Sequence, residues 1–185
     1  MIVEKVCKAG VKAVQLREKD LTSSQLLETA RKIKKITTRF NSSLIINDRL
    51  DIALLSDANG LHSPVNGFSA SLVKKISPLL ITGKSVHSAL EAIAAQKAGC
   101  DYILFGPIFR TPAKIKFGKP QGLAGLKKIC SAVRIPVFAV GGINPSRTKK
   151  CIDAGAYGIA VIRAIMKSEN IMETVNEFKN ELGVL

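Results

Sequence analysis

The sequence is poor in the residue types that build metal cages and disulfide frameworks. It has 185 residues, no tryptophan, two tyrosines and two histidines, His62 and His87. Its four cysteines, at positions 7, 100, 130 and 151, form no Cys-x-x-Cys pair. A disulfide framework and a zinc site are therefore not expected, and we predict that the cysteines are structural thiols in helices or at helix ends.

Long apolar segments are also missing. The mean hydropathy is only +0.19, and no run of residues approaches the roughly 20 apolar residues that a membrane-spanning helix needs. The segment Met1–Gly10 carries charged residues and lacks the apolar stretch of a signal peptide. The sequence predicts a soluble, cytoplasmic protein without a membrane partner.

Negative charge is scarce, with 14 Asp and Glu against 28 Lys and Arg, which gives a net charge of +14. No acidic residue occurs from Tyr102 to Ile152, a segment with ten cations: Arg110, Lys114, Lys116, Lys119, Lys127, Lys128, Arg134, Arg147, Lys149 and Lys150. This distribution predicts an anionic ligand. The alternative, a heat-adapted surface, usually adds Glu alongside Lys. Few aromatic residues and no nucleic-acid-binding motif favour small phosphorylated ligands over nucleic acid.

The order of short β-rich and helix-period segments predicts the fold. We expect one domain over residues 1–185, because the chain is too short for two ordinary enzyme domains. Seven strands are predicted: Ala13–Leu16, Leu44–Ile46, Gly60–His62, Ile81–Lys84, Tyr102–Phe105, Pro136–Val140 and Gly158–Ile162. Their alternation with helices favours an α/β fold of the TIM (β/α)8 barrel type, with a doubly wound sheet as the alternative.

Local signals mark the helix ends. Capping boxes are predicted at Thr22–Gln25 and Ser88–Glu91, and Asn144 precedes a proline as an expected N-cap. The final helix is predicted over about Ser168–Leu182. Three glycines are expected to end helices in a left-handed conformation: Gly10, Gly99 and Gly155.

Functional groups of such a barrel lie at the carboxyl ends of its strands. Arg17 and Lys19, two residues apart in an extended segment, face the same way and could hold one polyphosphate. The alternative is an ion pair with Glu18 or Asp20. Asp48 follows an apolar strand and could bind Mg²⁺ together with substrate phosphate. Its alternative role is an N-cap for a helix over Asp51–Leu55.

Further candidates follow the later strands. The loop from Gly106 to Gln121 is too long for a tight turn, and loops of this length are often functional. Gly141-Gly142 and Ile162-Arg163 fall where barrels often bind a phosphate, although close packing would also explain the two glycines. His87 could shuttle a proton, but a structural role is favoured for both histidines.

These segments together resemble the thiamine phosphate synthase family of (β/α)8 enzymes and its relative, the TenI-like thiazole tautomerase. The motifs are Q-L-R-E-K at 15–19, I-I-N-D at 45–48, D-Y-I-L-F-G-P-I-F at 101–109, T-P-A-K at 111–114 and A-V-G-G-I at 139–143. The resemblance implies that 4-amino-2-methyl-5-hydroxymethylpyrimidine diphosphate ionises and is captured by thiazole phosphate. The products would be thiamine phosphate and pyrophosphate.

The resemblance also implies site residues and a cofactor. Arg17, Lys19 and Lys114 would be catalytic, and Asp48 would bind Mg²⁺. The substrate-binding set would be Gln15, Leu16, Arg17, Glu18, Lys19, Asn47, Ser85, Thr111, Pro112, Ala113, Lys114, Gly142, Ile162 and Arg163.

Several positions depart from the family pattern. The second metal-binding aspartate falls at about Gly67, the second threonine of the T-x-T-K loop is Ala113, and a serine of the phosphate site is Arg163. The tautomerase's catalytic histidine falls at Pro107. A tautomerase acting on a monophosphate has little use for all five diphosphate-handling residues, so the synthase is preferred. These residues are Arg17, Lys19, Asn47, Asp48 and Lys114. The tautomerase and a non-catalytic phosphate-binding relative are the alternatives.

Alignment with the family assigns Gln15–Lys19 to the second strand. The barrel is therefore predicted to lack its first strand, unless the coding sequence starts further upstream. A barrel of that kind would leave an edge strand exposed, which favours association into a homo-oligomer.

Overall fold

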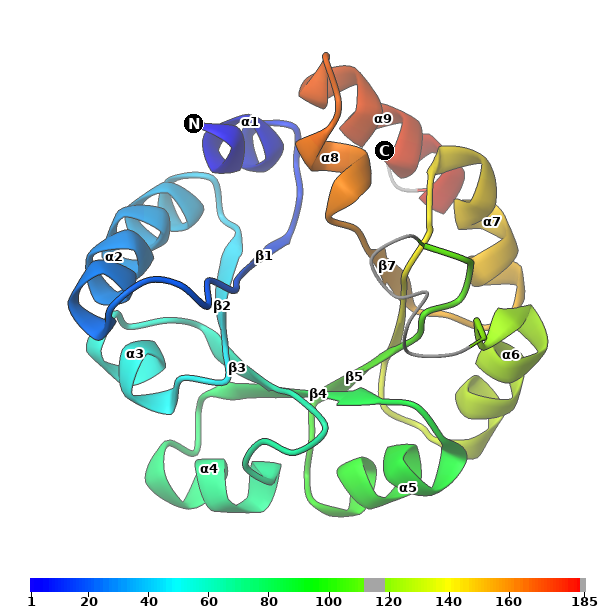
Figure 1. Cartoon of the computed structure of the whole chain (residues 1–185), viewed down its shortest axis with the longest axis horizontal. Helices are drawn as coiled ribbons and strands as arrows, with labels where there is room; N and C mark the ends of the chain where they lie inside the picture. Colours follow the sequence, from blue (N-terminus) through cyan, green and yellow to red (C-terminus); the bar gives the residue numbers. More distant parts are fainter. Residues whose placement is uncertain (112–118, 184–185) are drawn as a thin grey trace. The chain divides into compact units, whose positions relative to one another are not determined.

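The computed structural model describes residues 1–111 and 119–183 (Figure 1). The chain forms two compact units, Met1–Gly83 and Lys84–Leu185, which we call unit 1 and unit 2. Strand order follows chain order from β1 to β7. A doubly wound sheet reverses its strand order partway, so the predicted barrel-type α/β fold is confirmed over this alternative.

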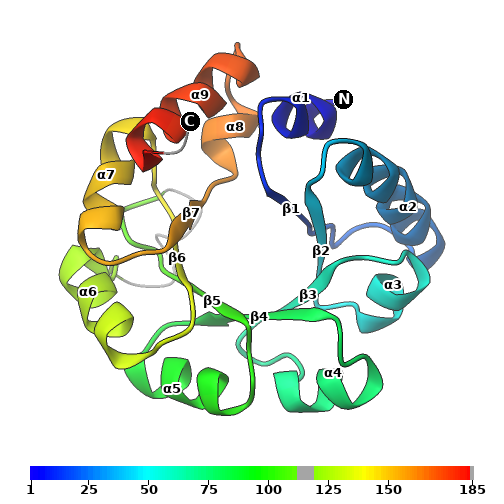
Figure 2. The ribbon, with the colours of Figure 1, turned by 180° about the vertical axis from the view of Figure 1, so that it is seen from behind.

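Unit 1 consists of three parallel strands and the first part of a fourth, with helices between them. Its elements are α1 (Ile2–Lys8), β1 (Ala13–Leu16), α2 (Ser23–Arg39), β2 (Ser43–Asn47), α3 (Leu50–Leu55), β3 (Gly60–Ser63), α4 (Ala70–Ile76) and the start of β4 (Ile81–Val86). Figures 1 and 2 show α2 and α3 on the same side of β1 to β3. Leu44, Ile46 and Leu61 of the strands pack there with Leu26 and Ile33 of α2.

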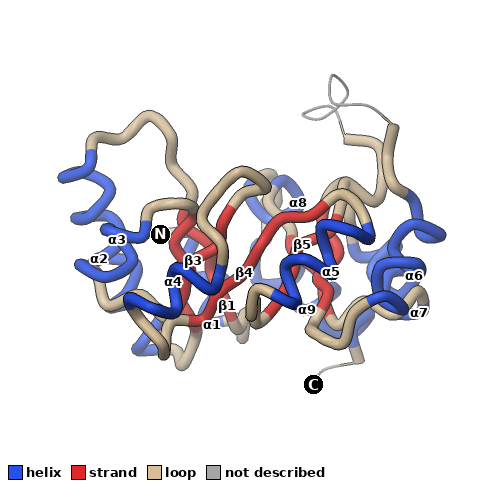
Figure 3. The backbone as a smooth tube through the Cα atoms, turned by 90° about the horizontal axis from the view of Figure 1, so that it is seen from below, coloured by secondary structure: helices blue, strands red, loops and turns tan. Residues whose placement is uncertain are grey.

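Unit 2 continues the alternation, which Figure 3 shows by colour. After the end of β4 come α5 (Ala89–Lys97), β5 (Tyr102–Phe105), α6 (Gly122–Ala132), β6 (Val137–Val140), α7 (Pro145–Asp153), β7 (Gly158–Ala160), α8 (Arg163–Met166) and α9 (Ile171–Leu182). Strand β6 pairs in parallel with both β5 and β7. The buried side chains include Ile103, Phe105, Leu126 and Cys151.

The seven predicted strands are all present, and their ends differ by up to two residues. The largest differences are at the carboxyl ends. Strand β4 continues to Val86 rather than Lys84, and β7 ends at Ala160 rather than Ile162. Ile162 is instead the N-cap of α8, so the chain has already turned toward that helix.

The predicted caps are confirmed with two differences. Thr22 and Gln25 form a complete capping box. Ser88 caps α5 by accepting from the Glu91 N–H at 3.2 Å, but the Glu91 carboxylate accepts from the His87 N–H at 2.6 Å. Asn144 precedes α7 without a side-chain cap. Gly10, Gly99 and Gly155 have the expected positive φ angles.

The thiols behave as structural groups. All four cysteines are free, and three of them are buried. Burial raises the pKa of the Cys130 and Cys151 thiols, which keeps both in the neutral form. Of the described helices, none is long and apolar enough to cross a membrane.

Two glycine-to-alanine changes test how closely the strands are packed. A Cβ on Gly60 would lie 2.6 Å from the Ile81 carbonyl oxygen, whereas one on Gly125 in α6 meets nothing closer than 3.5 Å. We expect Gly60→Ala to lower the free energy of unfolding by about 1–3 kcal/mol, because the strand backbone must shift. Gly125→Ala should raise it by about 0.5–1 kcal/mol, because alanine favours the helix. Urea unfolding of both variants measures the difference, and equal stabilities would contradict the packing.

Candidate active site

In unit 1, the parallel register brings the carboxyl ends of three strands to one edge. Leu16 of β1 pairs with Ile46 of β2, and Asn47 of β2 pairs with His62 of β3. The Asp48 N–H continues this ladder by donating to the His62 carbonyl at 2.9 Å. The segments that follow β1, β2 and β3 therefore all begin at this edge.

The segment after β1 presents two available cations at this edge. Leu16 is only 7% exposed and belongs to the core of unit 1. The other side chains of this segment are exposed: Gln15, Arg17, Glu18 and Lys19. Within residues 1–111 and 119–183, neither Arg17 nor Lys19 forms an ion pair with an acidic neighbour. The ion-pair alternative is therefore not found, and both cations can bind an anion.

Asp48 lies at the start of the next loop with a φ angle of +65°, which Asp tolerates better than most residues. The loop after β3 passes beside it, since a Cβ on Gly67 would lie 3.1 Å from the Asp48 Oδ1 atom. A Cβ at position 67 would also lie 2.7 Å from the Pro64 Cδ atom, so the loop in this conformation is suited to glycine. Position 67 therefore adds no second carboxylate beside Asp48.

Few side chains that could bind a metal lie beside Asp48 in the described part of the chain. No group of three or more His, Cys, Asp or Glu side chains that could hold a metal occurs in the described part of the chain. Mg²⁺ commonly binds one or two protein carboxylates and completes its octahedral shell with substrate phosphates and waters. Asp48 fits Mg²⁺ on these terms, together with a phosphorylated substrate.

The alternative role of Asp48 as a helix cap is not found. Arg49 is the N-cap of α3, and no side chain caps this helix. The Arg49 guanidinium donates to both carboxylate oxygens of Asp51, at 2.9 and 2.5 Å, and to the Ser23 hydroxyl at 3.0 Å. Its hydrogen bond holds the pKa of Asp51 below the ordinary value. Arg49 is therefore engaged by Asp51 and Ser23, and the Asp48 side chain caps no helix.

In unit 2, the loops after β5 and β6 pack together through their backbones. Gly141 and Gly142 have φ angles of +99° and +68°. A Cβ on Gly141 would lie 2.6 Å from the Pro107 Cβ, and one on Gly142 would lie 2.9 Å from the carbonyl oxygens of Phe109 and Arg110. The close-packing interpretation of the two glycines is thus correct. It does not exclude phosphate binding by the N–H groups that precede α7.

The structure describes some of the remaining predicted residues of unit 2 and not others. Ser85 is half-buried near the carboxyl end of β4, and Thr111 is half-buried after the loop segment that packs on Gly142. Ile162 and Arg163 are exposed at the start of α8, and Ile162 is 72% exposed. Three predicted residues lie outside the described residues: Pro112, Ala113 and Lys114.

The structure gives His87 a contact that the sequence did not reveal. Its Nδ1 atom lies 2.8 Å from the Gly106 carbonyl oxygen. A carbonyl only accepts, so Nδ1 carries the proton in this contact. Gly106 is buried. The favoured structural role of His87 is therefore supported, because its ring satisfies a buried backbone carbonyl at the start of the loop after β5.

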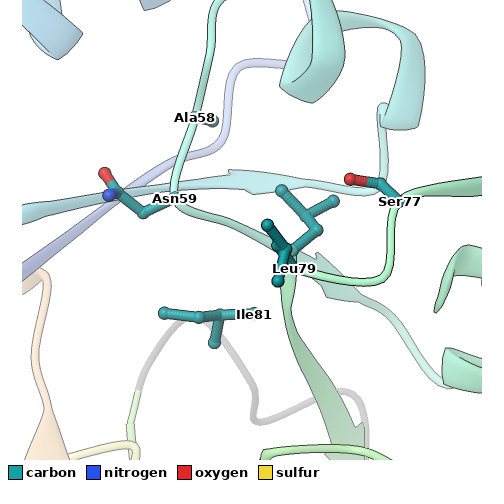
Figure 4. Close-up of a pocket in the computed structure, with 6 residues that line it drawn as sticks. Ala58, Asn59, Ser77, Leu79 and Ile81 are labelled. Carbon is teal, nitrogen blue, oxygen red and sulfur yellow. The ribbon is translucent and has the colours of Figure 1, made fainter.

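Unit 1 also has a cavity that lies away from these residues. It has a volume of about 320 Å³ in unit 1, at the amino ends of β3 and β4 (Figure 4), and its lining residues are Ala58, Asn59, Ser77, Leu79, Leu80 and Ile81. In the view of Figure 4, the Leu79 side chain lies between those of Asn59 and Ser77. None of the predicted site residues lines this cavity, so it is not part of the candidate active site.

Substitution of His87 tests its contact with Gly106. His87→Leu leaves a buried carbonyl without a donor, and we expect the free energy of unfolding to fall by about 1–3 kcal/mol. His87→Asn places an amide N–H near the position of Nδ1 and should recover most of the loss. Thermal and urea unfolding of both variants provide the measurement. Equal stability of the Leu and Asn variants would show that the hydrogen bond contributes nothing.

Comparison with known proteins shows which family the chain belongs to. The family model described as "Thiamine monophosphate synthase" matches residues 1–165. A thiamine-phosphate synthase of Clostridium novyi is 41% identical over 170 residues, which are 91% of this chain and 83% of that protein. A thiamine-phosphate synthase of Methanococcus maripaludis is 35% identical over 180 residues, 97% of this chain and 86% of that protein.

A solved structure extends the likeness to the fold. Thiamine phosphate pyrophosphorylase from Pyrococcus furiosus superposes with a TM-score of 0.91 at 34% identity, covering 98% of this chain and 88% of that one. The resemblance in the sequence motifs is thereby confirmed over most of the chain. The chain belongs to the thiamine monophosphate synthase family.

Proposed function

We propose that this protein joins 4-amino-2-methyl-5-hydroxymethylpyrimidine diphosphate to thiazole phosphate, forming thiamine phosphate and releasing pyrophosphate. The observation that carries the proposal is the family match over residues 1–165. The reaction needs cations that stabilise the departing diphosphate. Arg17 and Lys19 are exposed at the carboxyl end of β1 without acidic partners among the described residues. The protein is thus a transferase of thiamine biosynthesis.

The chemistry needs charge stabilisation and alignment. The bond between the pyrimidine's methylene carbon and the diphosphate oxygen breaks, and its electron pair leaves with pyrophosphate. The thiazole nitrogen then donates its lone pair to that carbon, so the positive charge ends on the thiazolium ring. Negative charge grows on the departing diphosphate, where preorganised cations lower the barrier. No covalent protein nucleophile is required.

Residues of unit 1 are proposed to hold the pyrimidine diphosphate. The Arg17 guanidinium can donate two parallel hydrogen bonds to phosphate oxygens, and the Lys19 ammonium acts as a point charge. Gln15, Glu18 and Asn47 are proposed as polar contacts, and Leu16 can contribute through its backbone. These groups act by binding and orienting the reacting carbon.

Magnesium is proposed to accompany this substrate. Asp48 would be its protein ligand, and the loop that contains Gly67 passes beside that carboxylate. When bound, Mg²⁺ supplies positive charge that stabilises the diphosphate as it leaves. With a single carboxylate, the metal would be held largely through the substrate, so we expect tighter Mg²⁺ binding in the presence of pyrophosphate.

Residues of unit 2 are proposed to hold the thiazole phosphate and the departing pyrophosphate. Gly142 offers backbone at the start of α7, and Thr111 offers a hydroxyl. Ile162 and Arg163 are exposed at the start of α8, so the Arg163 charge can reach a phosphate in place of a serine hydroxyl. Ser85 and Lys114 are proposed near the pyrophosphate. Pro112 and Ala113 complete the predicted set.

The tautomerase alternative is not retained. The position of its catalytic histidine is Pro107 in this chain, and proline offers no group for proton transfer. The relatives compared above are named as synthases or pyrophosphorylases. We further propose small phosphorylated molecules as the partners, the cytoplasm as the compartment, one functional domain over residues 1–185 and a homo-oligomeric assembly.

Turnover with both substrates tests the proposed function. The purified protein, incubated with Mg²⁺ and the two phosphorylated substrates, should release thiamine phosphate and pyrophosphate in equal amounts. Chromatography of the one and a coupled assay of the other provide the measurement. The absence of product at high protein concentration would overturn the assignment.

Asp48→Asn tests the proposed metal ligand. We expect kcat to fall by about 10²-fold or more, the size typical of losing one group that stabilises developing charge. Asn also tolerates positive φ, so the free energy of unfolding should change by less than about 0.5 kcal/mol. Asp57→Asn is the matched control, since Asp57 is also exposed with positive φ but lies before β3. An Asp48 variant as active as this control would remove the metal role.

A further inference from the structure

Backbone hydrogen bonds join the loops after β5 and β6, in addition to the close packing at Gly141 and Gly142. The Ile108 N–H donates to the Val140 carbonyl and the Phe109 N–H donates to the Gly141 carbonyl, both at 3.0 Å. A side chain at position 142 would collide with the carbonyls of the neighbouring loop. The segment from Pro107 to Arg110 and the Gly141-Gly142 turn therefore form one rigid pair.

Arg147 contacts both members of this pair. It lies in the first turn of α7 and is half-buried. Its Nη1 atom donates to the Gly142 carbonyl at 2.6 Å, and its guanidinium carbon lies 4.8 Å from the centroid of the Phe109 ring. One planar group thus satisfies a backbone acceptor and stacks on an aromatic face, which is a combination suited to arginine.

The contact with Gly142 fixes the orientation of the peptide bond that follows. In a trans peptide the C=O and N–H groups point in opposite directions. The carbonyl of Gly142 is held toward Arg147, so the N–H of Ile143 points away from it. No residue within the described ranges accepts a hydrogen bond from this N–H, although Ile143 is only 6% exposed. A buried donor of this kind is available to an anion at the start of α7.

We propose that Arg147 is a positioning residue of the thiazole phosphate site. It holds the Gly142–Ile143 peptide and the Phe109 segment in the arrangement that receives the phosphate, without itself touching the phosphate. This inference rests on the proposed function, because that function places the phosphate at Gly142. The effect of Arg147 is expected on the binding of one substrate and not on the other.

Steady-state kinetics of Arg147→Met tests this role with each substrate varied in turn. We expect the KM for thiazole phosphate to rise at least about tenfold, as for loss of one hydrogen bond from a charged donor. The KM for the pyrimidine diphosphate should stay within about twofold. Arg134→Met is the matched control, because it removes one exposed positive charge from the same unit and should leave both KM values unchanged.

Phe109→Leu separates positioning from direct contact with the phosphate. This substitution removes the aromatic ring that the Arg147 guanidinium contacts, and it leaves the charge of the protein unchanged. If Arg147 positions the loops, Phe109→Leu should raise the same KM, and the double variant should be no worse than Arg147→Met alone. If the two substitutions raise the KM for thiazole phosphate additively, Arg147 is a direct ligand of the phosphate. The same conclusion follows if Arg147→Lys keeps the wild-type KM and Phe109→Leu leaves it unchanged. An unchanged KM in Arg147→Met would overturn the inference.

Phosphate titration keeps this test separate from that of the proposed function. If the wild-type protein forms no thiamine phosphate, the proposed function fails. Calorimetric titration with inorganic phosphate then decides the inference. Weaker binding by Arg147→Met than by Arg134→Met would support a phosphate site at Gly142, and equal or absent binding in both would contradict it.

Discussion

The parallel register of the strands is the constraint on which the candidate active site depends. Each βα unit returns the chain to the same end of the sheet, so every strand reaches its carboxyl end at the same edge within its unit. In unit 1 this places Asn47 at the end of β2 and Arg17, Asp48 and Gly67 in the segments after β1, β2 and β3, because β2 is paired in register with both β1 and β3. In unit 2 the pairing of β5 with β6 aligns Phe105 with Ala139, so Gly106 follows opposite Val140 and Pro107 opposite Gly141.

The cations of unit 1 differ in whether they pair with an acidic residue of the protein. Arg17 and Lys19 are exposed and without acidic partners in the described ranges, whereas Arg49, only two residues beyond Asn47, is held by Asp51. Arg49 therefore stabilises a loop of the protein, whereas Arg17 and Lys19 are the cations that we propose for the ligand. A leaving group that departs with several negative charges needs groups of the second kind, already in place before the bond breaks.

Sequence patterns were sufficient for features that depend on neighbouring residues. Apolar β-rich runs located the strands, and Thr22 with Gln25 located a helix start, because both signals are local. The motif at 15–19 located the cations, although Leu16 within it lies in the core. The strand end at Ile162 was wrong, because the turn into α8 begins two residues earlier than hydrophobicity indicates.

Contacts between loops could not be predicted, because they depend on which backbone segments meet in space. The His87 ring binds a carbonyl 19 residues away, and Arg147 stacks on a phenylalanine from the preceding loop. The place of Gly67 beside Asp48 likewise depends on the path of the loop after β3. The glycine pair at 141–142 predicted a phosphate site or close packing, but the sequence did not show which backbone segment packs against it.

Calorimetric titration with inorganic pyrophosphate in the presence of Mg²⁺ tests whether Arg17 and Lys19 hold the diphosphate. We expect one binding site in the wild-type protein. The affinity should be at least about tenfold weaker after Arg17→Gln with Lys19→Gln, as expected when charge-assisted hydrogen bonds are lost. Lys8→Gln with Lys12→Gln removes the same charge before β1 and should bind like the wild type. Equal affinity in the two double variants would show that Arg17 and Lys19 do not hold the diphosphate.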